Sequence, residues 1–171
     1  MTLDEVRKAV LEFKKAQEEE QEGVELLRWL LALLWAQRFN YHFLHWTVSG
    51  TGYYGNHLLF QRLYESVVGD IDTLGEKMVG IFGENAVDPT NITAKFVTWL
   101  ERWNDVGGND ARGLLRRGLQ SEEDMQQCCE DAYNVLKMTG EITLGMDDFL
   151  MAMANAHETN SYLLQQALRN E

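Results

Sequence analysis

The chain has 171 residues, of which 45% are hydrophobic, and its formal net charge at pH 7 is −12. This length supports one compact domain with a sizeable core but is short for two. The acidic balance argues against a dedicated nucleic-acid surface, which needs Lys and Arg to neutralise phosphates, and makes metal cations more natural partners. Because acidity also simply keeps a protein soluble, the charge indicates a function only together with a site.

The N-terminal residues lack the basic and then apolar pattern of a secretion signal, and the longest apolar run, residues 29–36, is too short to span a bilayer. We therefore expect a cytoplasmic protein with no membrane partner. The two cysteines, Cys128 and Cys129, are adjacent, so a disulfide between them would be strained. A reducing compartment and passive thiols fit this arrangement better.

Apolar residues recur at three- to four-residue spacing along most of the chain, which contains a single proline and no internal repeat. The fold class is therefore predicted to be all-α. An N-terminal helical arm is expected over residues 1–22, followed by the main domain over residues 23–171. The apolar residues of the arm at helical spacing are Leu3, Val6, Val10 and Phe13. Seven acidic residues outnumber four basic ones in this arm, so it is not a polybasic tail.

The sequence of the main domain predicts two long helices, a long crossover and two more long helices. The first helix is expected over about 24–48 and ends at a glycine-rich corner, and the second is expected over about 55–82 and closes at a glycine. The crossover spans about 84–120 and carries a short helix around 94–103. This order is typical of a ferritin-like four-helix bundle, in which a parallel pair of helices needs a connection that spans the bundle.

The starts of the last two helices are predicted from capping and charge. The third helix is expected to begin at Ser121, with Ser121 as its cap and Asp124 as the capping-box acid, and to run to about Thr139. The fourth is expected from near Asp147 to about Arg169, because acidic residues suit the positive end of the helix dipole.

A polar stripe follows the second helix within an arc of about 100°. It comprises His57, Gln61, Glu65, Asp72 and Glu76. Helix geometry alone favours an ordinary solvated face. His45 changes this balance, because it ends the first helix only a short corner away from His57 and lies among aromatic residues. Imidazoles and carboxylates with open coordination positions suit Fe(II), which takes mixed nitrogen and oxygen ligands and must leave room for an oxidant.

These residues resemble the signature of the Dps family of mini-ferritins. The family has a His-Trp pair, here His45 and Trp46, and a second histidine twelve residues on, here His57. An Asp-x-x-x-Glu motif, here Asp72 and Glu76, begins twenty-seven residues after the first histidine.

A second region agrees, because residues 148–150, His157, Glu158 and Tyr162 are similar to the family's last helix, in which the aromatic is usually Trp. The resemblance covers about residues 24–169. It implies a hollow homo-oligomer of about twelve subunits that binds Fe(II), oxidises it and stores ferric mineral. Hydrogen peroxide is the oxidant that the resemblance favours, with O2 as the alternative, so the function would include protection from oxidative damage.

By this resemblance, His45, His57, Asp72 and Glu76 are ligands of a ferroxidase centre, and Trp46 lies close to the oxidation chemistry. Gln61 departs from the pattern, because the family usually has a carboxylate there, and this puts the iron stoichiometry in doubt. Asp148 matches an acid that lines the three-fold iron entry pores of the family. Asp147 and Asp148 fit equally well as helix N-terminal acids.

The predicted metal site lies between two subunits. His57 and Asp72 are fifteen residues apart, which on one continuous helix corresponds to about 22 Å. One ion cannot touch both, because bonds from iron to nitrogen and oxygen are only about 2 Å long. Two copies that pack antiparallel about a two-fold axis near Glu65 and Ser66 would join the histidine end of each to the carboxylate end of the other.

Three alternatives remain open. A conventional ferritin or bacterioferritin is disfavoured, because no Glu in the sequence is followed three residues later by His. A DNA-compacting protein, as some family members are, is disfavoured by the acidic arm. A structural helical assembly with a degraded metal site is the third alternative, with Gln61 as its only sequence hint.

The remaining candidate residues are not included in the metal site. His42 is interpreted as a surface or packing residue and His157 as a hydrogen-bonding residue. Arg116 and Arg117 are assigned no role.

Overall fold

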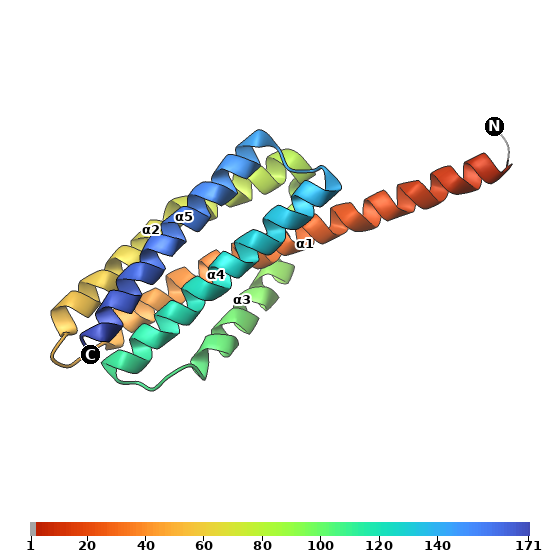
Figure 1. Ribbon diagram of the computed structural model, residues 1–171. Helices are drawn as coiled ribbons and strands as arrows, with labels where there is room; N and C mark the ends of the chain where they lie inside the picture. Colours follow the sequence, from red (N-terminus) through yellow and green to blue (C-terminus); the bar gives the residue numbers. More distant parts are fainter. Residues whose placement is uncertain (1–2) are drawn as a thin grey trace.

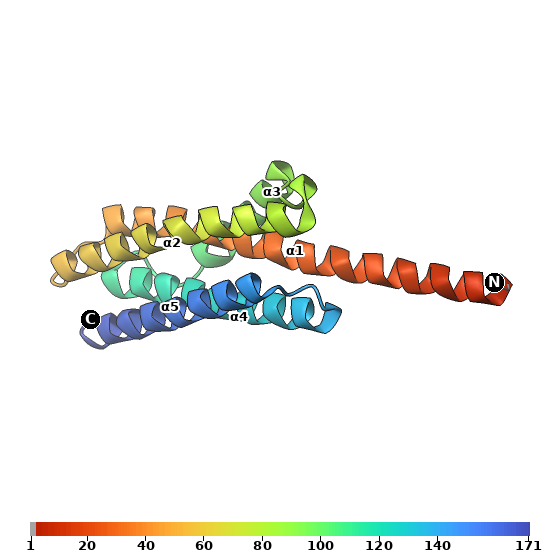
Figure 2. The same cartoon turned by 90° about the horizontal axis from the view of Figure 1, so that it is seen from above.

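The computed structural model describes residues 3–171, with side chains from residue 22 onward. Its α-helices are, in chain order, α1 (Leu3–Thr47), α2 (Tyr53–Phe82), α3 (Pro89–Asn104), α4 (Ala111–Thr139) and α5 (Leu144–Arg169), with a short 3-10 helix, η1 (Glu84–Ala86), after α2. The predicted all-α, ferritin-like arrangement is confirmed. Figure 2 shows two layers, α1 with α2 and α4 with α5, while α3 packs against α1 and also contacts α4.

α1 is one continuous helix of 45 residues, so the expected arm and the first core helix are not separated by a break. Its N-terminal part projects beyond the end of the bundle in both views (Figure 1, Figure 2). At 1.5 Å rise per residue, residues 3–22 correspond to about 30 Å of helix. The division of the chain at residues 22 and 23 stays a prediction.

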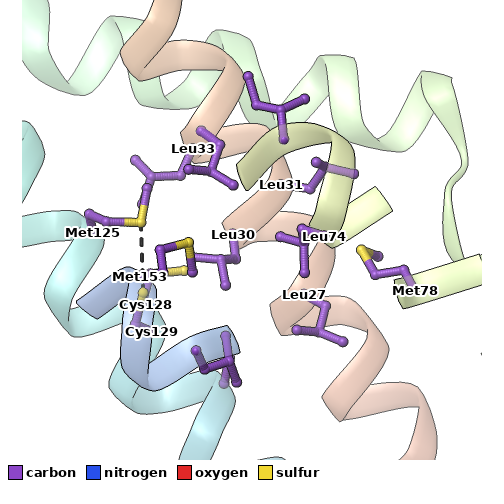
Figure 3. Close-up of a cluster of buried hydrophobic side chains, with 14 of the residues drawn as sticks. Leu27, Leu30, Leu31, Leu33, Leu74, Met78, Met125, Cys128, Cys129 and Met153 are labelled. Carbon is purple, nitrogen blue, oxygen red and sulfur yellow. Dashed lines mark hydrogen bonds between the residues drawn. The ribbon is translucent and has the colours of Figure 1, made fainter. Parts of the chain in front are cut away.

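The bundle core is apolar along most of its length. Figure 3 shows one part of it, where Met125, Cys128, Cys129 and Met153 face leucines of the α1 and α2 layer. A second cluster, which includes Tyr41, Phe60 and Leu164, fills the bundle near the corner between α1 and α2. The helices approach closely there, because a Cβ atom added to Gly118 of α4 would lie 3.1 Å from the Leu164 side chain and 3.5 Å from the Tyr41 ring.

The predicted start of the third long helix is wrong. α4 begins at Ala111, and its N-cap is Asp110, whose side chain accepts a hydrogen bond from the Gly113 amide at 2.8 Å. Ser121 is fully buried inside α4, where its hydroxyl lies 2.9 Å from the Tyr41 hydroxyl. Asp124 accepts hydrogen bonds from α3 instead of closing a capping box. The capping pattern misleads because Ser and Asp make equally good tertiary hydrogen bonds inside a bundle.

The two other helix starts lie a few residues before their predicted positions. α3 begins at Pro89, because the Asp88 side chain accepts a hydrogen bond from the Thr90 amide and a proline fits the first helical turn. α5 begins at Leu144, since the Thr143 hydroxyl accepts from the Met146 amide at 3.1 Å. Local capping therefore sets both boundaries.

Among residues 3–171, no helix is long and apolar enough to cross a bilayer. Both cysteines are buried free thiols. Burial, followed by the charges of Asp131 and Asp124, raises the pKa of Cys128 to about 12. These facts agree with the interpretation of the cysteines as passive thiols.

Candidate metal centre

His45 and His57 meet at the corner between α1 and α2. His45 lies in the last turn of α1, and His57 lies near the start of α2. The corner between the two helices contains Gly50 with a φ of +100°, a conformation that glycine adopts without strain. The two imidazole rings stack with centroids 3.7 Å apart and planes at 21°, and both rings are partly exposed.

The two histidines orient each other through the backbone. His45 Nδ1 donates to the His57 carbonyl at 2.9 Å, and His57 Nδ1 donates to the His45 carbonyl at 2.8 Å. Because a carbonyl oxygen can only accept, each Nδ1 must carry the hydrogen, and the neutral ring then keeps its lone pair on Nε2. Metal-binding histidines commonly have this arrangement, in which a second hydrogen bond sets the tautomer and the ring orientation.

Aromatic rings surround the pair. The Tyr53 ring lies 5.1 Å from the His57 ring, and Tyr64 approaches His45 edge-on at 5.4 Å. His42 packs against Tyr64 at 3.8 Å, and burial, followed by the charge of Arg38, lowers its pKa. Trp46 is 64% exposed and stacks on His42 at 5.2 Å. His42 therefore packs as predicted and supports Trp46 at the surface beside the pair.

Asp72 and Glu76 lie on the exposed side of α2, one turn apart. Since α2 is continuous from Tyr53 to Phe82, the separation of 15 positions between His57 and Asp72 corresponds to about 22 Å. The two carboxylates line an open groove of about 620 Å³ together with Trp35 of α1. The histidines and the carboxylates of one chain therefore occupy different stretches of the same helix.

Gln61 and Glu65 lie between these two ends. The Gln61 amide donates to a Glu65 carboxylate oxygen at 2.9 Å. A neutral amide at this position adds no negative charge to the histidine end. A cation near His57 would therefore meet less negative charge than it would with a carboxylate at position 61.

One chain brings together two of the predicted ligands and leaves the others apart. Across residues 22–171, no three His, Cys, Asp or Glu side chains are grouped so that they could hold a metal ion. Asp148 is exposed on α5, a helix that begins at the end of the bundle opposite the corner between α1 and α2 (Figure 1). Asp147 lies in the first turn of α5, as expected of a helix N-terminal acid.

Apolar side chains are exposed on the helices that carry the predicted ligands. They are Trp35, Phe39, Phe43 and Trp46 on α1 and Leu58, Val68 and Val79 on α2. At 100° per residue, Val68 and Val79 fall within the same arc of α2 as the polar stripe. Exposed apolar side chains gathered beside polar groups are typical of a protein interface.

A second histidine site, inside the bundle, is not evident from the sequence. Glu122 of α4 is fully buried, and its carboxylate contacts both the Tyr41 hydroxyl and His157 Nδ1. Burial opposes the charge on His157, but the carboxylates of Glu122 and Asp70 outweigh this effect and raise its pKa. A signal is visible in retrospect, because Glu122 interrupts the apolar series of α4 between Leu115 and Cys129. His157 is a hydrogen-bonded core residue, as predicted.

Neither a protein-family model nor a curated protein matches this sequence. Solved structures do match its fold. Dps from Thermosynechococcus elongatus has a TM-score of 0.76 and 19% identity, and the match covers 90% of this chain and 94% of that one. The chain has the Dps fold.

Two further solved structures also have this fold. The Dps protein from Vibrio cholerae O1, described as a member of a broad superfamily of ferritin-like diiron-carboxylate proteins, has a TM-score of 0.71 and 16% identity over 88% of this chain and 91% of that one. A dodecameric thioferritin from Bacteroides fragilis has a TM-score of 0.69 and 15% identity over 92% and 93%. At such identities, the likeness to Dps extends to the fold alone.

Proposed function

We propose that this protein is a Dps-like ferroxidase that binds Fe(II) between subunits, oxidises it and stores the ferric product in a hollow shell. The observation that carries the proposal is the reciprocal hydrogen bonding of His45 and His57, which leaves a lone pair on each Nε2 at a partly exposed surface. The Dps fold and the spacing of Asp72 and Glu76 support it.

In the proposed assembly, the exposed apolar face of α1 and α2 packs against the same face of a second copy. An antiparallel pair about an axis near Glu65 and Ser66 joins the histidine end of each chain to the Asp72 and Glu76 end of the other. Each dimer then holds two equivalent sites. A closed shell of about twelve copies is the form that we propose, with Asp148 beside the pores through which iron enters.

The donor set suits the chemistry of iron oxidation. Imidazole nitrogens bind Fe(II), and the two carboxylates supply negative charge that stabilises the more highly charged Fe(III) product. With hydrogen peroxide, two Fe(II) ions give up one electron each, the O–O bond breaks, and two protons complete two water molecules. The same reaction therefore produces the ferric iron that is stored and removes the peroxide that causes oxidative damage. We assign Trp46 a place beside this chemistry.

A direct test follows the absorbance of ferric iron after anaerobic Fe(II) loading and addition of peroxide. We expect the wild type to oxidise iron faster than buffer and to keep the product soluble. A His45→Ala, Asp72→Ala variant should follow the buffer time course, whereas a Glu84→Ala, Glu101→Ala variant, which removes two exposed acids elsewhere, should match the wild type. A wild type that only follows buffer would end the ferroxidase assignment.

Complementation tests the shared site. A His45→Ala, His57→Ala variant and an Asp72→Ala, Glu76→Ala variant are each inactive in this scheme. When they are mixed, dissociated and reassembled, a mixed dimer has one site with all four ligands and one site with none, so activity should return to a fraction of the wild-type value. Verified mixed assembly without any recovery would count against a site between subunits.

A further inference from the structure

The N-terminal part of α1 extends away from the bundle that the rest of the chain forms. Figure 1 and Figure 2 show it continuing along the axis of α1 past the end of the other helices. Because α1 is unbroken from Leu3 to Thr47, this part cannot fold back onto its own α4 and α5 without breaking the helix. Any helix pair that it packs against must therefore belong to another molecule.

The sequence of this part has an apolar stripe of its own. Leu3, Val6, Val10 and Phe13 follow the three- to four-residue spacing that Val24, Leu27, Leu31 and Leu34 continue further along α1. The latter four residues are all buried in the bundle. Gln17 and Glu20 occupy the intervening positions of the same series, so the stripe over residues 3–13 is separate from the buried one. A stripe of this kind is stable in water when a second surface covers it.

An open groove lies between α4 and α5, in the layer opposite α1 and α2. Its volume is about 410 Å³. It is lined by Gln126, Cys129, Glu130 and Tyr133 of α4 and by Leu150, Met151, Ala154 and Glu158 of α5. Met151 is 60% exposed in the single chain. The α5 wall spans about 12 Å along the helix, and residues 3–13 span about 15 Å.

The charges are complementary as well. The groove carries the exposed carboxylates of Glu130 and Glu158. In a helical projection of the sequence, Arg7 and Lys14 fall about 60–80° from the centre of the apolar stripe, at one of its edges. A helix that lays its apolar stripe in a groove places such edge residues beside the groove rim.

We propose that residues 3–13 of one chain dock as a helix in the α4–α5 groove of a neighbouring copy, with Arg7 and Lys14 beside Glu130 and Glu158. The arm is then a strap that links subunits at a surface other than the α1–α2 face. This proposal rests on the assembly of several copies, which is part of the proposed function. Within an assembly, even a weak contact of this length is maintained, because the neighbouring groove is present at high effective concentration.

Methionine oxidation of the metal-free, full-length protein tests the strap. Met138, which is 75% exposed near the end of α4 and outside the groove, is the internal reference for Met151. With a small oxidant and peptide mass analysis, we expect Met151 to be oxidised several-fold more slowly than Met138 in the assembled wild type. An Arg7→Glu, Lys14→Glu variant should bring the two rates close together.

The matched control is Lys8→Glu, Lys15→Glu, which makes the same charge change on the side nearly opposite the stripe and should leave Met151 protected. Adding Glu130→Lys and Glu158→Lys to the Arg7→Glu, Lys14→Glu variant should restore protection. Equal oxidation of Met151 and Met138 in an assembled wild type, or an equal effect of the control pair, overturns the proposal. Light scattering on the same samples distinguishes failure of this proposal from failure of the proposed function. If the wild type is a monomer, the assembly that the proposed function requires does not form.

Discussion

The two histidine sites of this molecule use the same side chain in opposite ways. At the corner between α1 and α2, His45 and His57 are partly exposed, and their Nδ1 atoms meet neutral carbonyl oxygens. Inside the bundle, His157 is 1% exposed, and its Nδ1 meets the buried carboxylate of Glu122. The first environment leaves a lone pair for a metal, whereas the second favours a protonated ring that has none to offer.

The comparison shows that the partner of Nδ1 and the exposure of the ring decide the role of a histidine. A carbonyl oxygen fixes the tautomer without adding charge, and so prepares the ring to bind a cation. A buried carboxylate instead makes the ring half of an ion pair, whose loss leaves an uncompensated charge in the core. Four predictions test how far this difference extends.

The largest expected effect is on stability. Glu122→Ala leaves His157 and the Tyr41 hydroxyl without their buried partner, so it should lower the free energy of unfolding by about 3–5 kcal/mol. His45→Ala, at the surface, should lower it by at most about 1 kcal/mol. Denaturant titration measures both. If Glu122→Ala does not fold, Glu122→Gln gives the comparison, and losses of equal size in the two regions would contradict it.

For iron oxidation, we expect substitutions at the corner between α1 and α2 to have the larger effect and substitutions at the core site the smaller one. His45→Ala and His57→Ala should each lower the rate at least about tenfold, because even the partners of metal ligands contribute 10–100-fold to affinity or activity. His157→Gln should leave the rate per folded protein close to that of the wild type. Stopped-flow absorbance of ferric product measures the rate. A loss of activity in His157→Gln without a loss of fold would make the core site part of the chemistry.

The two sites should respond to pH with opposite signs. The folded pKa of His157 is raised above its unfolded value of about 6.5, so its stabilisation is complete below that value and is lost as the pH rises through the raised pKa. The stability advantage of wild type over His157→Gln should therefore shrink as the pH increases. Binding of Zn(II), a redox-inert probe, at the corner between α1 and α2 should become stronger as the pH increases, because metal ligands must be deprotonated. Parallel trends in both measurements would refute the distinction.

The smallest effect concerns the thiols beside the core site. Burial raises the pKa of Cys129, as do the nearby Cys128, Asp70 and Glu122. Both cysteines should therefore remain unmodified by a thiol reagent in the native protein and react only after unfolding. A colorimetric thiol assay with and without denaturant checks this, and rapid native labelling would show that the core opens more readily than its burial indicates.

The sequence predicts the corner between α1 and α2 well, because its signals are local. A helical stretch, a glycine-rich turn and a second helical stretch bring residues twelve apart into contact, and no distant element is needed. The start of α4 is different. Ser121 and Asp124 have the pattern of a cap, but they bond to Tyr41 of α1 and to α3, and no local pattern reveals those partners.

The candidate site divides in the same way. The stacking of His45 and His57 follows from neighbouring segments, whereas the contact of Glu122 with His157 needs two helices in their final positions. The joining of the histidines to Asp72 and Glu76 depends on a second molecule. It stays a prediction, because the contacts of one chain cannot specify the surface of another.

The reciprocal hydrogen bonds at the corner also bear on the order in which the chain folds. His45 and His57 close a loop of twelve residues, whereas Tyr41 and Glu122 are 81 residues apart in the sequence. Because short loops close at a smaller entropic cost and local contacts form sooner, the histidine pair should assemble before the core is complete. A chain still folding would then already present two oriented imidazoles, so that the two histidine ligands that we propose are in place before the bundle is complete.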